Sequence, residues 1–250
     1  MRIFLTLVRR ELGGYFGTLS GYVVIASVQM LLGLSFYSLV SVLTQEGSDT
    51  PLAEFFYETL YFWLILLIAT PVITMRTFAL EKYSGTYETL MTAPVGDVPV
   101  VLAKFLGAMV FYLVMWTPLL GCLWLIKQLT GDPTALEPGA AIGTVLGILL
   151  LGCVYISLGC FASSITHSQI IAAMTSFAVG VGLYLLSFLA PSVSTLPGWF
   201  PKVLRQMSMM EHMRDFVRGI VDTGHVVFYL SITLFFLFLN CKAVESRRWK

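Results

Sequence analysis

The residues that could carry chemistry in this chain of 250 residues are few and spaced unfavourably for it. Its three histidines, His167, His212 and His225, lack the short, regular spacing of a metal-binding motif. Methionine thioethers suit Cu(I), but they also pack loosely at lipid interfaces, which is the interpretation we favour. The methionines around His212 are Met207, Met209, Met210 and Met213.

Catalysis by a nucleophile or a bound nucleotide is not supported either. The hydroxyl residues between Ser157 and Ser168 contain no G-x-S-x-G turn. No G-x-x-x-x-G-K-[ST] phosphate loop occurs in the chain. The cysteines lie in or beside apolar runs without a C-x-x-C pair, so we interpret them as small buried hydrophobes: Cys122, Cys153, Cys160 and Cys241. We therefore expect no enzyme and no metal or cofactor in this chain.

The composition indicates which elements must position these residues. Hydrophobic residues make up 57% of the chain and charged residues 12%. Uncharged runs of about 18 residues or more recur, each long enough to cross a bilayer. A net charge of +1 gives no electrostatic footprint for nucleic acid. The predicted fold class is all-α, a polytopic membrane protein with one transmembrane domain over residues 1–250.

Six apolar runs are predicted to be transmembrane helices, at residues 21–43, 55–78, 100–126, 139–163, 170–190 and 226–241. The fourth carries Gly139, Gly143 and Gly147 at four-residue spacing. Small residues in this pattern let another helix approach closely along one face.

Residues 1–20 are predicted to form an amphipathic helix. Apolar residues alternate there with Arg2, Arg9, Arg10 and Glu11, which is typical of a helix in the membrane interface with its arginines toward anionic headgroups. An ordered cytosolic lead-in with no role of its own fits the pattern equally well. Because charged residues interrupt the apolar run, a cleavable signal peptide is not expected.

The basic residues predict the orientation. With a cytosolic N-terminus, six spans return the C-terminus to the cytosol, and ten of the 15 basic residues lie there, as the positive-inside rule favours. These ten are Arg2, Arg9, Arg10, Arg76, Lys82, Lys104, Lys242, Arg247, Arg248 and Lys250. The acidic first loop, with Glu46, Asp49, Glu54 and Glu58, then faces outward. We expect a multi-pass protein of the cell inner membrane.

Residues 191–224 are too polar to cross the membrane and too apolar to be a plain loop. Between Trp199 and Asp222, an apolar stripe recurs at helical spacing opposite a charged stripe. The apolar stripe comprises Val203, Met207, Met210, Val217 and Val221, and the charged one Glu211, Arg214, Asp215, Arg218 and Asp222. We predict an external amphipathic, re-entrant helix or a broken helix pair. His212, Asp215 and Arg218 are its candidate functional residues.

The polar stretch at residues 81–99 separates the second and third spans and faces the cytosol in this orientation. It can hold two turns of helix, with Ser84 or Thr86 as the N-cap and Glu88 at the positive helix start. Pro94 cannot continue a helix, so the helix is expected to end before it. A soluble partner can recognise such an exposed helix.

Three stretches together resemble the permease subunits of type-2 ATP-binding-cassette (ABC) exporters, in particular the gliding-motility-like branch. In the loop, the matching residues are Lys82, Gly85-Thr86, Glu88, Thr92-Ala93-Pro94 and Lys104. Before the last span, residues 211–219 are similar to the family's usual run, and the third stretch is the C-terminal Glu245-Ser246-Arg247-Arg248-Trp249. The resemblance covers essentially the whole chain.

The resemblance implies a function. It makes residues 85–91 the coupling helix that docks on an ATPase, and the implied contact residues are Gly85, Thr86, Tyr87, Glu88, Thr89, Leu90, Met91 and Pro94. A separate nucleotide-binding subunit would bind ATP and Mg²⁺, and a second copy or a similar permease would complete the transport path. The implied activity is export of a substrate that the sequence does not name.

Two other classes of function stay open. The chain can instead be a structural or energy-transducing membrane subunit of a larger gliding or secretion machine. An integral-membrane enzyme fits less well, because it needs ionisable groups converging inside the membrane, and the predicted spans are nearly free of charge.

Overall fold

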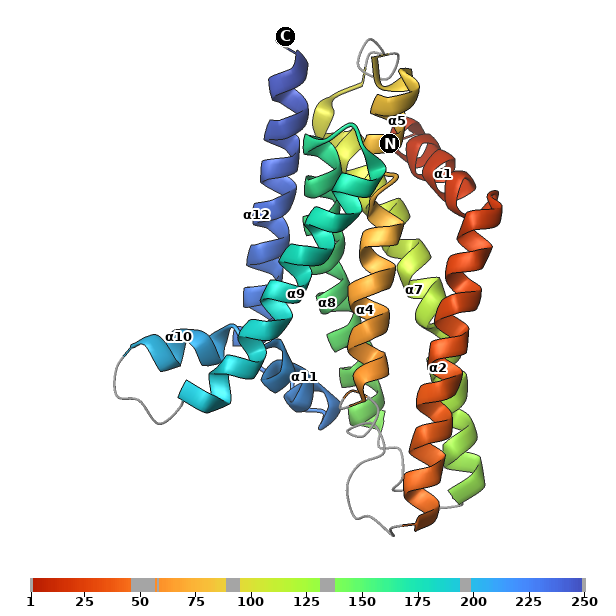
Figure 1. Ribbon diagram of the computed structural model, residues 1–250, viewed down its shortest axis with the longest axis vertical. Helices are drawn as coiled ribbons and strands as arrows, with labels where there is room; N and C mark the ends of the chain where they lie inside the picture. The colour runs from red at the N-terminus through yellow and green to blue at the C-terminus, as the bar shows by residue number, and fades with distance from the viewer. Residues whose placement is uncertain are drawn as a thin grey trace.

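The computed structural model describes residues 2–45, 57, 59–88, 95–130, 138–193 and 199–248, and the regular structure within these ranges is helical (Figure 1). Six of the helices are long and apolar enough to cross a membrane. They are α2 (Leu19–Gln45), α4 (Leu60–Thr74), α7 (Asp97–Thr130), α8 (Pro138–Ile165), α9 (Gln169–Val193) and α12 (Thr223–Arg248). The prediction of an all-α protein with six spans is confirmed.

The observed helices start and end a few residues away from the predicted runs. The third begins at Asp97 rather than at residue 100, and the last covers Thr223–Arg248 rather than 226–241. Hydropathy places only the apolar part of a helix, whereas its hydrogen-bonded backbone continues into the polar flanks. As a consequence, Lys104 lies two turns inside α7 and does not mark the start of that helix.

The spans form a central group and an outer group. Helix α8 packs against α4, α7, α9, α11 and α12. In its apolar window, 72% of the residues are buried within the chain, compared with 22% in each of α2, α9 and α12. The central helices α4, α7 and α8 therefore form the core, and the outer three present most of their apolar surface to lipid or to another chain.

Three short or terminal elements gather at one end of the bundle. Helix α1 (Arg2–Phe16) crosses the bundle obliquely beside α5 (Ala79–Ser84), and the C-terminal end of α12 points to the same side (Figure 1). Helix α1 packs on α7 and contacts the start of α2. Arg9 and Arg10 are exposed on α1, while Tyr15 is buried and stacks on Phe111 of α7, with 5.0 Å between ring centroids.

Toward the other end of the bundle, a pair of short helices, α10 (Phe200–Gln206) and α11 (Met209–Val217), runs across the long helices (Figure 1). This is the broken pair that the sequence predicted as one of two options. Helix α11 begins at Ser208, whose side chain accepts a hydrogen bond from the Glu211 N–H. That contact is half of a capping box, and the S-x-x-E pattern at residues 208–211 was a signal the sequence analysis missed.

The residues of the predicted apolar stripe do not form one face buried against the bundle. Val217 is buried, but Val203 and Val221 are 47% and 48% exposed. These residues would share one face only on a single continuous helix. The chain breaks between Gln206 and Met209, which rotates α11 relative to α10. The buried side of α11 consists of Met209, His212, Met213, Phe216 and Val217.

Helix α11 packs on the glycine face of α8. A Cβ added at Gly143 would lie 1.9 Å from the backbone oxygen of Phe216, and one at Gly147 would lie 2.7 Å from the Met213 sulfur. The close approach predicted along this face is confirmed at these two positions. The approaching element is the short helix α11 and not another span.

Candidate functional site

The end of the bundle that holds α1 and α5 contains the described part of the predicted partner-contact segment, Gly85–Glu88. Helix α4 ends at Thr74, a tight turn follows, and α5 covers Ala79–Ser84. Gly85 then takes a left-handed conformation with φ of 75°, which side chains other than glycine rarely adopt. Because of this turn, the chain changes direction and re-enters helical conformation at Thr86–Glu88.

The expected capping arrangement differs from the one observed. Ser84 is the last residue of α5 and not the cap of a following helix. Its hydroxyl lies 2.9 Å from the Thr86 hydroxyl, which brings together the two candidate caps on either side of Gly85. Tyr87 is buried, with the Lys82 ammonium 5.3 Å from its ring centroid, whereas Thr86 and Glu88 are exposed. Thr89, Leu90, Met91 and Pro94 lie outside the described residues.

Two adjacent residues of α8, Ser163 and Ser164, hold α5 on that helix. The hydroxyl of Ser163 accepts hydrogen bonds from the N–H groups of Phe78 (3.1 Å) and Ala79 (3.0 Å), which have no partner within the helix. It donates in turn to the Met75 carbonyl at 3.2 Å. One turn further, the Lys82 ammonium donates to the Ser164 carbonyl. Ser163 therefore caps α5 from a distant helix, and sequence reasoning missed it.

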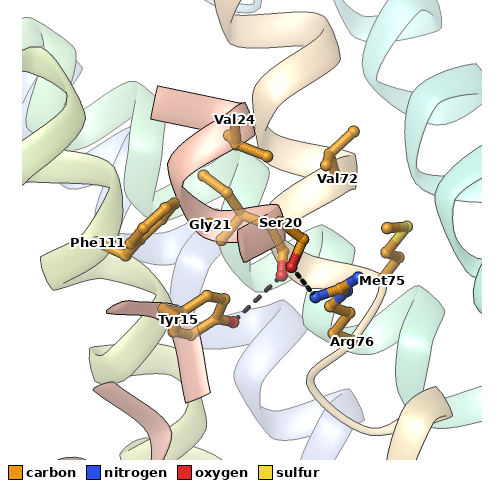
Figure 2. Close-up of a pocket in the computed structure, with 9 residues that line it drawn as sticks. Tyr15, Ser20, Gly21, Val24, Val72, Met75, Arg76 and Phe111 are labelled. Carbon is orange, nitrogen blue, oxygen red and sulfur yellow. Dashed lines mark hydrogen bonds between the residues drawn. The ribbon is translucent and has the colours of Figure 1, made fainter. Parts of the chain in front are cut away.

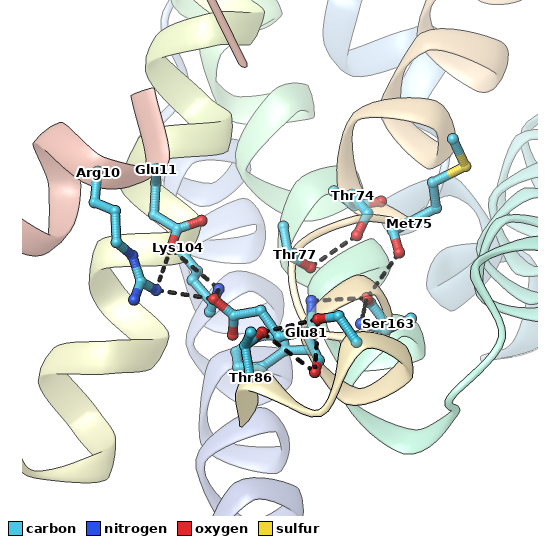
Figure 3. A network of polar contacts seen from close by, with 12 residues as sticks. Arg10, Glu11, Thr74, Met75, Thr77, Glu81, Thr86, Lys104 and Ser163 are labelled. Carbon is cyan, nitrogen blue, oxygen red and sulfur yellow. Dashed lines mark hydrogen bonds and ion pairs between the residues drawn. The ribbon is translucent and has the colours of Figure 1, made fainter. Parts of the chain in front are cut away.

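A four-residue ion cluster connects α5 to α1 and α7 (Figure 3). Glu11 and Glu81 each place one carboxylate oxygen near the Lys104 ammonium, at 3.1 and 2.9 Å. The Arg10 guanidinium contacts the same two oxygens, at 2.9 and 2.8 Å. Two carboxylates are thus shared by two cations, and three helices distant in sequence are linked through them.

The ion cluster is partly enclosed. The Lys104 side chain is 2% exposed and those of Glu11 and Glu81 are 13% and 17% exposed, while Arg10 is 48% exposed. Burial lowers the pKa of Arg10, but the hydrogen bond to Glu11 and the charges of both carboxylates outweigh this, so its pKa is raised. Lys104 also lies 5.2 Å from the centroid of the Phe78 ring. The cluster therefore holds α5 in a defined position.

The predicted residues of the second segment separate into two environments. His212 is 1% exposed, and its ring stacks on that of His225 with 3.9 Å between centroids. Asp215 is on the outer side of α11, where its carboxylate lies 3.8 Å from His225 Nδ1. Arg218 is the C-cap of α11 and precedes Gly219, which has a φ of 76°. His212, Asp215 and Arg218 therefore do not form one surface.

Across the described ranges, no group of three or more His, Cys, Asp or Glu residues is arranged to hold a metal ion. The thioethers of Met209 and Met213 lie in the apolar core beside His212 and pack toward α8. Both side chains are buried in the core, so the predicted loose packing at a lipid interface is wrong for Met209 and Met213.

Comparison with known proteins gives one family. The family model described as ABC-2 family transporter protein matches residues 37–239, which is more than half of the chain. A search among curated proteins found no match. The matched region includes the last third of α2, the whole of α4, α7, α8 and α9, most of α12, the turn at Gly85, and the α10–α11 pair.

Proposed function

Because this chain belongs to the ABC-2 family of transporter proteins, we propose that it is an exporter permease that couples to a separate ATPase through the segment at Gly85–Glu88. That it is a membrane-spanning permease subunit follows from the family and from its six apolar helices. The observation that carries the coupling proposal is the connection of α5 to three other helices. A short exposed helical segment follows directly from this anchored element.

The anchoring explains how movement of a partner could reach the membrane. A docking element transmits force only if it moves together with the spans. The ion cluster links α5 to α1 and α7, and Ser163 and Ser164 link it to α8. Displacement of the exposed residues Thr86 and Glu88 would therefore be passed to central helices of the bundle and not absorbed by a loose loop.

The partner would supply the energy. We propose an ABC ATPase subunit that binds ATP with Mg²⁺, because the metal and the phosphate-binding loop stabilise charge in phosphoryl transfer. A second copy of this chain, or a similar permease, would complete the transport path. The poorly buried outer helices α2, α9 and α12 leave apolar surface that a second copy can cover in part.

We place the end of the bundle with α1 and α5 in the cytoplasm of a cell with an inner membrane. Arg9 and Arg10 are exposed at this end, and Lys82 lies in α5 beside them. Basic residues near span ends favour the cytosolic side. Export, and membership of the gliding-motility-like branch, rest on the resemblance of the loop and of residues 211–219. A structural role in a larger machine predicts no substrate-dependent ATP hydrolysis.

The test uses the permease reconstituted with its ATPase in vesicles. Glu88→Lys reverses the charge on the exposed segment, and Gly85→Ala forces a side chain into the left-handed region, at a cost of roughly 1–2 kcal/mol locally. Both variants should insert normally, bind the ATPase more weakly, and lose most transport-linked ATP hydrolysis. ATPase capture and phosphate release are the measurements.

Each variant has a matched control. Gln128→Lys introduces the same charge at an exposed position near the far end of α7. Gly182→Ala adds the same methyl group within α9, where nothing lies within 4 Å of the new Cβ. Both controls should keep full coupling. Full ATPase binding and activity in Glu88→Lys and Gly85→Ala would refute coupling through this segment.

A further inference from the structure

A cavity of about 260 Å³ with charged side chains in its wall lies beside the ion cluster, between α1, α7 and the turn that follows α4. This is far more than the ~10–15 Å³ that one water molecule needs. The charged groups lining it are the four members of the ion cluster (Arg10, Glu11, Glu81 and Lys104) and Arg76. Three basic groups therefore face two carboxylates, which leaves one positive charge without a counter-ion in the cavity wall.

The uncompensated charge is that of Arg76. Arg10 and Lys104 each contact both carboxylates of the ion cluster. Within the part of the chain that the structure describes, Arg76 contacts no carboxylate, and its one hydrogen-bond partner is the Ser20 hydroxyl (Figure 2). A guanidinium has five N–H donors in a planar fork, so most of its donor capacity is available to an anion.

A second, smaller cavity of about 40 Å³ adjoins the first and shares Tyr15 and Arg76 with it. Apart from those two residues and Ser20, its walls are apolar, and Figure 2 shows Val24, Val72 and Phe111 around it. These side chains belong to the first turns of α2, the last turn of α4 and the middle of α7. The smaller cavity therefore extends from the cationic site toward the membrane-spanning part of the bundle.

We propose that the two adjoining cavities bind one anionic phospholipid. Its phosphate group would pair with Arg76 and the exposed part of Arg10, since guanidinium groups bind phosphate oxygens through two parallel hydrogen bonds. The first carbons of one acyl chain, next to the glycerol group, would enter the smaller cavity beside Val24 and Val72. The site lies where the apolar spans α2 and α4 meet the polar helix α1, which is the depth of the lipid headgroups.

The combination of a cationic cavity and an apolar cavity favours a lipid over free phosphate as the ligand. Inorganic phosphate would satisfy Arg76 but would leave the apolar cavity unused. A diacylglycerol would fill the apolar cavity but would leave the guanidinium unpaired. Only a ligand with both parts uses both cavities. This inference does not depend on coupling to the ATPase, because it concerns the permease chain alone.

The experiment measures lipid binding to the full-length, delipidated protein in an uncharged detergent by native mass spectrometry. The probes are dioleoyl phosphatidylglycerol, dioleoylglycerol and inorganic phosphate. Phosphatidylglycerol should bind at least about tenfold more tightly than either of the others. Arg76→Gln should weaken phosphatidylglycerol binding by about tenfold, the usual loss for one charge-assisted contact. Arg76→Lys, which keeps the positive charge, should weaken phosphatidylglycerol binding less than Arg76→Gln does.

Arg9→Gln is the matched control, because Arg9 is exposed on the same helix α1 but does not line either cavity. It should bind phosphatidylglycerol as the wild type does. Val24→Phe should fill the smaller cavity and weaken phosphatidylglycerol binding while leaving phosphate binding unchanged. This variant tests the site even if Arg76→Gln folds poorly. Equal binding by wild type, Arg76→Gln and Val24→Phe would overturn the proposal. Displacement of the lipid by equimolar phosphate would overturn it as well.

Discussion

At the scale of single residues, Lys104 is the most completely enclosed member of the ion cluster. Its ammonium lies between the carboxylates of Glu11 and Glu81, and its side chain is 2% exposed. A lysine is tolerated in such a position only when its charge is paired, because burying an unpaired charge costs several kcal/mol. Lys104 therefore stabilises the contact of α7 with both α1 and α5.

We predict that Lys104→Met destabilises the protein by on the order of 3 kcal/mol, because it leaves two partly buried carboxylates with Arg10 alone. The midpoint of thermal unfolding in detergent measures this effect. Adding Glu81→Gln to Lys104→Met should restore part of the loss by removing one of the like charges. Lys242→Met should have little effect, since Lys242 and Glu245 form an exposed pair. Equal losses in Lys104→Met and Lys242→Met would contradict this role.

His212 is the residue whose titration should be most visible. Burial, and next the neighbouring His225, lower its pKa to about 4, although the charge of Asp222 acts in the opposite direction. Within the described residues neither ring nitrogen of His212 has a hydrogen-bond partner. The folded protein therefore keeps His212 neutral, whereas the unfolded chain binds a proton near the ordinary pKa of about 6.5.

The direction of the pH effect follows from this difference. The unfolded state binds more protons between pH 6.5 and pH 4, so stability should be complete above that range and fall as the pH drops through it. Unfolding midpoints at about pH 7.5 and pH 5 should differ more for the wild type than for His212→Phe, which cannot titrate. His167→Phe, at an exposed position, should leave the pH dependence of the wild type unchanged. If the unfolding midpoint of His212→Phe depends on pH as strongly as that of the wild type, His212 is not the cause of the pH dependence.

At the scale of elements, α11 is an amphipathic helix whose inner side packs on α8. Val217 is fully buried, and Gly143 of α8 lies against the backbone of the same helical turn at Phe216. Asp215 on the outer side is half-exposed. The position of α11 therefore depends on apolar burial and close backbone contact, and little on its exposed charges.

We predict that Val217→Asp lowers the amount of folded protein in the membrane, because it places a carboxylate in the apolar contact between α11 and α8. Asp215→Asn should be close to neutral, because it alters a half-exposed contact with His225. Size-exclusion profiles of the solubilised proteins and their unfolding midpoints measure both effects. Equal tolerance of the two substitutions would show that α11 is not held by its buried side.

At the scale of the whole molecule, the ends of the bundle differ in chemistry. One end carries α1, α5 and the C-terminal part of α12, and the opposite end carries the far end of α7 (Figure 1). We predict that Ser84 faces the cytosol and Gln128 the outside. With single cysteines in a cysteine-free background, an impermeant thiol reagent should label Gln128→Cys on intact cells and Ser84→Cys only after permeabilisation. The reverse result would exclude a cytosolic ATPase docking at α5.

The exposed apolar surface of the outer spans leads to a prediction about assembly. When the permease is purified with its ATPase, native mass spectrometry should find two copies of the 27.7 kDa chain, or one copy with a similar permease, for every two ATPase subunits. Two permease copies can enclose a path between their outer helices, whereas one chain has its central space filled by α8. A complex with a single permease chain would contradict this assembly.

Much of this protein is determined by local sequence. Six apolar runs specify six helices because a backbone in lipid must satisfy its own hydrogen bonds. The alternating pattern of residues 1–20 predicts α1, and the polar stretch at residues 81–99 contains the turn at Gly85. The break within the α10–α11 pair was predicted as an option, and the S-x-x-E pattern at residues 208–211, which the sequence analysis missed, is a local signal for it. All of these features depend on neighbours a few residues apart.

The tertiary structure alone determines which residues meet. Lys104 contacts Glu11, 93 positions away, and Ser163 caps α5 from 84 positions away. His212 is buried and Val203 exposed because the break before Ser208 rotates α11 against α8. Arg76, which the sequence analysis counted only among the basic residues of the cytosolic side, lines two cavities between α1, α2, α4 and α7. Hydropathy and periodicity carry no information about such pairings, because they describe one segment at a time, while charge compensation and packing depend on how several segments come together.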